Sequence, residues 1–117
     1  MDAYITLSPS NDGITDDAPA DVGIPKIAIG GWSNQESGFL CNSNDDWERF
    51  PSPNILSSIE EREFFVQFVD GSLEVGKVGE APFMTVSYSC AVDVKYIGIA
   101  SGHGGDVQWR YCEYAAF

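Results

Sequence analysis

Residues 102–111, GHGGDVQWRY, bring the only histidine of the chain together with carboxylate, amide, guanidinium and indole groups. The glycines favour a tight turn, and beyond it Asp106, Gln108 and Arg110 alternate with apolar residues, so they share one strand face. A solvated hairpin explains this pattern, and so does a sugar site, because polar groups hydrogen-bond hydroxyls while an aromatic ring stacks on the apolar face of galactose. The predicted sugar-binding residues here are His103, Asp106, Gln108, Trp109 and Arg110.

A second polar stretch beside an aromatic residue is GGWSNQES, residues 30–37. Its Asn34 and Glu36 are predicted to join the sugar site. Trp32 follows two glycines and is expected in the core rather than in a binding platform. Trp47 lies in an acidic, proline-rich loop and is expected to be the most exposed tryptophan, which makes it an alternative stacking ring to Trp109.

The sequence contains little that indicates nucleotide binding or catalysis. The chain has no P-loop, no GxSxG elbow and no GxGxxG between a strand and a helix. With one histidine, a Ser–His or Cys–His pair could form only around His103, and a cysteine in a strand is usually a small buried hydrophobe. No catalytic residue is therefore predicted.

Charge limits the classes of partner. Eighteen acidic against six basic residues give a net charge of −12, which disfavours nucleic acid and anionic membrane surfaces. The loops 8–25 and 42–54 are rich in Asp and Asn, which serve both calcium binding and turn formation. Neither loop has EF-hand spacing, so no metal site or cofactor is predicted, and calcium stays open.

Three cysteines, Cys41, Cys90 and Cys112, are too widely spaced for a CxxC zinc site. One disulfide with a free thiol, or three reduced thiols, both fit the sequence. The chain shows no signal peptide and no run of about 18 apolar residues that could span a membrane.

Apolar residues alternate with polar ones along most of the chain, which predicts strands. Asp70-Gly71 between two such runs predicts a type I′ hairpin, and a capping-box spacing at Ser58 and Glu61 predicts one short helical turn. The chain is expected to form a single domain, 1–117, an all-β antiparallel sandwich, jelly-roll-like, of about seven to nine short strands. The apolar residues that follow this alternating pattern, and so share one face of their strands, include Ala3, Ile5, Leu7, Ile27, Ile29, Phe64, Val66, Phe68, Leu73, Val75, Val78, Met84, Val86, Tyr88 and Cys90.

Three segments, residues 25–39, 63–86 and 94–111, together resemble the farnesoic acid O-methyltransferase domain family over nearly the whole chain. The matching motif positions are Ile29-Gly30-Gly31-Trp32, Asn34, Ser37, Gly71, Val75-Gly76, Pro82-Phe83, Gly98, Gly105 and Trp109. The resemblance implies a β-sandwich binding module, because methyl transfer from S-adenosylmethionine usually needs a βαβ unit. Some marine-invertebrate galactose-binding lectins are similar to this family.

The combined expectation is a non-catalytic lectin that binds galactose- or N-acetyllactosamine-terminated glycans. One shallow site binds weakly, so a homo-oligomer, a dimer or tetramer, is expected to supply multivalency. No nucleic acid or membrane insertion is expected, and an extracellular location is favoured. The alternatives are an enzyme that methylates a small isoprenoid acid, as the family name suggests, and an extracellular protein-interaction module.

Overall fold

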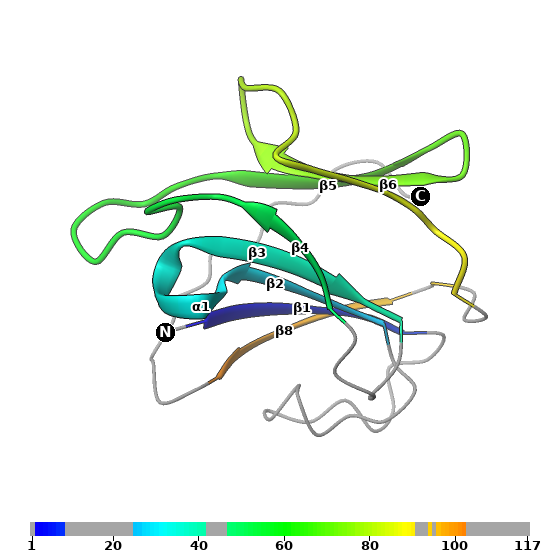
Figure 1. Cartoon of the computed structure of the whole chain (residues 1–117), viewed down its shortest axis with the longest axis horizontal. Coiled ribbons are helices and arrows are strands. Elements are labelled where there is room, and N and C mark those ends of the chain that lie inside the picture. Colours follow the sequence, from blue (N-terminus) through cyan, green and yellow to red (C-terminus); the bar gives the residue numbers. More distant parts are fainter. Residues whose placement is uncertain (1, 9–24, 42–46, 91–93, 95, 103–117) are drawn as a thin grey trace.

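The computed structural model describes residues 2–8, 25–41, 47–90, 94 and 96–102, and these residues form a two-layered β-structure (Figure 1). The elements are β1 (Asp2–Ser8), β2 (Lys26–Gly30), α1 (Gly31–Asn34), β3 (Glu36–Leu40), β4 (Glu48–Pro51), β5 (Phe64–Val69), β6 (Ser72–Lys77), β7 (Met84–Ser87) and β8 (Tyr96–Gly102).

The described strands form two sheets, a large one in the order β4-β3-β2-β1-β8 and a small one in the order β5-β6-β7. Every pairing between these strands is antiparallel. The small sheet stacks over the large one (Figure 1). The chain is therefore an all-β antiparallel sandwich, as the period-two pattern predicts.

One apolar core lies between the two sheets. The large sheet supplies Ile5, Ile27 and Ile29 to it, and the small sheet supplies Leu73 and Val75. These side chains occupy alternate positions of their strands, so the inward faces predicted from the sequence are confirmed for them. Further inward-facing residues of the small sheet are Met84 and Val86, with Phe64, Val66 and Phe68 packed against them.

The outer face of the large sheet is also buried at its centre. Tyr4, Thr6 and Ser8 of β1 are at most 3% exposed, although they point away from the core. Lys26 and Ala28 of β2, at their register positions opposite Thr6 and Tyr4, are equally buried. β1 and β2 are thus covered on both faces, whereas alternation in the sequence predicts strands with one solvated face.

The hairpin between β5 and β6 has the predicted geometry. Asp70 and Gly71 have φ values of 49° and 80°, and a type I′ turn requires positive φ at both central residues. Beyond the other end of β6, Val78 is 56% exposed, so the prediction that it continues the pattern of Leu73 and Val75 is wrong. The strand ends at Lys77, and the inward alternation set by Leu73 and Val75 ends with it.

The predicted helical turn at Ser58 and Glu61 is absent. The hydroxyl of Ser57 instead accepts hydrogen bonds from the backbone N–H groups of Ile59 and Glu60, at 3.1 and 3.2 Å. This is the local turn chemistry that serine commonly provides. Within the described residues, the short helix is α1, and no helix there is long and apolar enough to cross a membrane.

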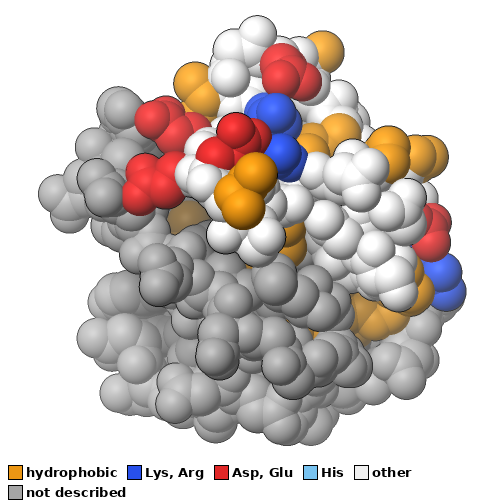
Figure 2. Space-filling model, turned by 90° about the vertical axis from the view of Figure 1, so that its left-hand side faces the viewer, with side chains coloured by type: hydrophobic (Ala, Val, Ile, Leu, Met, Phe, Trp, Pro, Cys, Tyr) orange, Lys and Arg blue, Asp and Glu red, His pale blue; other side chains and the backbone are white. Residues whose placement is uncertain are grey.

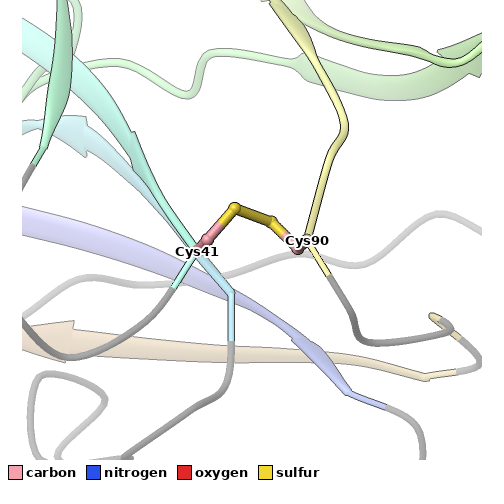
Figure 3. Close-up of a disulfide and its surroundings, with 2 residues drawn as sticks. All are labelled: Cys41 and Cys90. Carbon is pink, nitrogen blue, oxygen red and sulfur yellow. A yellow bond between two sulfur atoms is a disulfide. The ribbon is translucent and has the colours of Figure 1, made fainter.

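A disulfide joins Cys41 to Cys90 (Figure 3), which resolves the open alternatives for these two cysteines. Cys41 follows β3 in the large sheet and Cys90 follows β7 in the small sheet, so the bond ties the two layers of the sandwich together. Cys112 lies outside the described residues.

Candidate functional site

The connection from β2 to β3 is a left-handed turn. Gly30 has φ 72°, and inside α1 the residues Trp32, Ser33 and Asn34 have φ values of 50°, 63° and 62°. A left-handed conformation costs a non-glycine residue about 1–2 kcal/mol. Three consecutive residues of this kind require surrounding contacts that offset the strain.

Asn34 supplies three hydrogen bonds that support this turn. Its Nδ2 donates to the carbonyl of Leu56 at 2.9 Å, and its Oδ1 accepts from the N–H of Leu56 at 2.9 Å. The backbone carbonyl of Asn34 also accepts from the N–H of Asn54 at 2.7 Å. The side chain therefore clamps the turn to the segment that follows β4. This gives Asn34 a structural role, and its predicted sugar contact stays a prediction.

A buried hydroxyl pair supports the same turn from the core side. The Oγ atoms of Ser37 and Ser52 lie 2.6 Å apart, and Ser37 Oγ accepts from the N–H of Gly30 at 3.3 Å. A side chain at position 30 would be crowded, since a Cβ there would lie 2.5 Å from Leu56 Cδ1 and force that side chain to shift. The family motif residues Gly30, Asn34 and Ser37 thus form one supporting framework.

This framework holds Trp32 against the outer face of the large sheet. There Tyr4, Ala28, Trp32 and Trp47 form a cluster separate from the core, which we call the outer aromatic cluster. The indoles of Trp32 and Trp47 pack edge to face, with centroids 5.7 Å apart and an interplanar angle of 83°. Trp47 also contacts Tyr4 at a centroid distance of 6.4 Å. Both tryptophans remain partly exposed.

Gly38 of β3 makes space for the two indoles. A Cβ at this position would lie 3.0 Å from Trp32 Cη2 and 3.1 Å from Trp47 Cε3. Both distances are tighter than ordinary van der Waals contact, so a side chain there would push the rings outward. The bare backbone of Gly38 allows the indoles to lie close to the sheet.

An ion pair borders the outer aromatic cluster. The guanidinium of Arg49 lies over the Trp32 ring, 4.5 Å from its centroid, and Arg49 Nη1 is 3.1 Å from Glu36 Oε1. Their side chains are 49% and 35% exposed. Gly38 faces Arg49 in the strand register, which places Glu36 and Arg49 diagonally on one sheet face. A partly exposed ring, a guanidinium and a carboxylate are therefore presented together.

The structure brings only some of the predicted site residues together. The structure brings Glu36 and Trp47 to one surface, and Trp47 is partly buried against its neighbours rather than freely exposed. Trp32 lies outside the core, because the left-handed turn carries it to the outer face, so its predicted core position is wrong. The predicted residues His103, Asp106, Gln108, Trp109 and Arg110 lie outside the described residues.

Arg49 is the functional candidate that the sequence reasoning missed. The available signal was its spacing: Trp47, which directly precedes β4, and Arg49 within β4 are separated by one residue. For calcium, the described residues contain no group of three or more His, Cys, Asp or Glu side chains that could hold a metal ion. Most of the two acidic loops falls outside those residues.

The fold and this surface define an all-β sandwich with an aromatic and charged patch on one outer sheet face. A family model described as farnesoic acid O-methyl transferase matches residues 1–115, and the chain belongs to this family. No curated protein and no solved structure gave a match.

Proposed function

We propose that the protein binds glycans with terminal galactose or N-acetyllactosamine and does so without catalysis. The observation that carries the proposal is the edge-to-face pair of Trp32 and Trp47 bordered by the Arg49–Glu36 ion pair. An indole ring offers a surface for the C–H face of a pyranose. The guanidinium donates hydrogen bonds to sugar hydroxyls and the carboxylate accepts them.

Rigidity of the surface supports this proposal. Trp32 is fixed by a turn that Asn34 clamps through two hydrogen bonds, and Arg49 is held by both Glu36 and the Trp32 ring. Groups ordered before binding lose less conformational entropy when a ligand arrives. The ring and the ion pair therefore suit a small ligand that offers few contacts.

A shallow patch of this kind binds one sugar weakly, since hydroxyl desolvation offsets much of the gain. Multivalency would supply useful avidity, so the proposal includes a homo-oligomer, a dimer or a tetramer. The Cys41–Cys90 disulfide favours an oxidising compartment, where extracellular glycans are found. Size-exclusion chromatography that gives only monomer at working concentration would count against an agglutinating role.

The family description supports a different candidate, methyl transfer to a small isoprenoid acid. Isothermal titration with S-adenosylmethionine tests it directly. Saturable binding, followed by methyl ester formation from farnesoic acid, would replace the lectin proposal with an enzyme. A protein-interaction module is the remaining alternative, and it predicts no glycan binding.

The decisive experiment is a glycan array of the purified protein, run with calcium and with EDTA, followed by titration with lactose. Arg49→Gln removes the guanidinium and should weaken lactose binding about tenfold, because a charged hydrogen-bond partner contributes about 1.5 kcal/mol or more. Lys77→Gln is the matched control: it makes the same charge change on the small sheet, where Lys77 pairs with Glu80 at 3.4 Å. Near-ultraviolet circular dichroism verifies that both variants fold.

The outcomes separate the candidates. Selective signal on galactose-terminated glycans that Arg49→Gln weakens and Lys77→Gln leaves unchanged supports the proposed site. Binding that neither variant alters would move the site away from the outer aromatic cluster. A blank array under both conditions would reject the lectin function.

A further inference from the structure

We infer that the outer-face site selects neutral glycans and rejects galactose capped by an acidic group such as sialic acid. This inference rests on the proposed function and names the class of glycan that its site takes. It comes from the charge balance around Arg49, whose guanidinium lies over the Trp32 ring of the outer aromatic cluster.

The positive charge of Arg49 already has a partner. Glu36 Oε1 lies 3.1 Å from Arg49 Nη1, and the Trp32 ring covers the guanidinium at 4.5 Å. An acidic ligand would have to compete with the Glu36 carboxylate, which belongs to the same chain and lies 3.1 Å from the guanidinium. An intramolecular group of this kind acts at a high effective concentration. A neutral hydroxyl can hydrogen-bond to the intact ion pair, whereas an anion must displace Glu36 from Arg49.

Neighbouring charges do not favour an acidic ligand. Glu48, which precedes Arg49 in β4, is acidic and exposed, and its side chain points to the opposite face of the strand from Arg49. The other described cations do not offer a free charge, because Arg62 pairs with Glu60, Lys77 pairs with Glu80, and Lys26 is 1% exposed.

The overall charge of the protein also disfavours acidic ligands. On the face in Figure 2, basic side chains lie directly beside acidic ones. With a net charge of −12, the protein generates a potential that opposes the approach of anions and weakens as salt rises.

The test compares lactose with 3′-sialyllactose by nuclear magnetic resonance titration, at about 20 mM and about 500 mM sodium chloride. These concentrations change the screening length from roughly 20 Å to roughly 4 Å. We expect sialyllactose to bind about tenfold more weakly than lactose at low salt and only about twofold to threefold more weakly at high salt, because screening removes the repulsion.

Two matched variants isolate the role of the ion pair. Glu36→Gln removes one negative charge and frees Arg49. At low salt, the ratio of the dissociation constants of sialyllactose and lactose should therefore fall at least threefold. Glu48→Gln removes one negative charge from the preceding residue of β4, whose side chain points to the opposite face from Arg49. It should narrow the affinity ratio of the two sugars by less than twofold. Comparing the two sugars within each variant cancels any general effect of the substitution on the site.

Equal affinity for the two sugars, or tighter binding of sialyllactose, would overturn the inference. An affinity ratio that neither salt nor Glu36→Gln changes would also overturn the inference, because the discrimination between the two sugars would then be steric. Absence of binding by both sugars would instead reject the proposed function, so the two failures are distinguishable.

Discussion

Loss of the Cys41–Cys90 disulfide should lower the free energy of unfolding by about 4 kcal/mol. The bond joins residues separated by 49 positions. In the chain-entropy treatment, closing a loop of this length removes roughly 14 cal/mol/K from the unfolded state, which is about 4 kcal/mol at 25 °C. The stabilisation therefore comes from the unfolded chain more than from a contact in the folded one.

The assay is urea unfolding followed by tryptophan fluorescence, with the oxidised protein compared to the same protein in a strong reductant. Because both samples keep every side chain, the difference isolates the cross-link. With a slope of about 1.5 kcal/mol per molar urea, the midpoint should fall by about 2.5–3 M. The double variant Cys41→Ala/Cys90→Ala should lose slightly more, since both cysteines also pack against the core.

A loss below about 1 kcal/mol would refute the loop-closure argument, because it would mean that the unfolded chain already holds the two sheets' cysteines close together. A loss well above the loop estimate of about 4 kcal/mol in the reduced wild-type protein would refute it in the other direction. The bond would then be required for core packing itself.

Three further changes test the framework beneath the site. Gly30→Ala should cost about 3 kcal/mol in urea unfolding, because it combines a left-handed φ of 72° with a Cβ placed 2.5 Å from Leu56; a loss under about 1 kcal/mol would show that the turn relaxes freely. Asn34→Ala should cost about 2 kcal/mol by removing two hydrogen bonds to Leu56, and unchanged stability would mean that water replaces the clamp. Gly38→Ala should cost about 1–2 kcal/mol and shift tryptophan emission, since its Cβ displaces both indoles; an unaltered spectrum would contradict the tight packing at this position.

Local sequence patterns correctly predict those parts of the fold that depend on a single strand and its turn. Met84 and Val86 face inward while Thr85 faces outward, as alternation predicts. Asp70-Gly71 forms its hairpin because Asp-Gly is one of the pairs that tolerate positive φ at both central positions. Such features need only the period of a strand and the conformational freedom of glycine.

Other features of the fold depend on tertiary contacts and could not be predicted from local sequence patterns. The burial of Tyr4 and Thr6 depends on what covers the outer face of the large sheet, and alternation within β1 cannot report that. The left-handed turn at Trp32 and Ser33 depends on the clamp from Asn34 to Leu56, 22 residues away, and neither residue type favours such a backbone.

The candidate site was predictable only in part for the same reason. Glu36 and Trp47 were identified by residue type, yet their meeting depends on the register of β3 with β4. Arg49 enters the site through that register and through its stacking on Trp32, and both are properties of the folded sheet. The role of the residues around His103 stays a prediction.

The position of β1 between β2 and β8 has a consequence for how the chain folds during synthesis. β1 pairs with Lys26–Gly30 and, on its other edge, with Tyr96–Gly102, so one of its two neighbours is made much later. At about 5–20 residues per second, β1 waits roughly 5–20 s for β8. The β5-β6-β7 meander has only local pairings and can form before β8 is made. We therefore expect the large sheet to close last, after translation has passed residue 102.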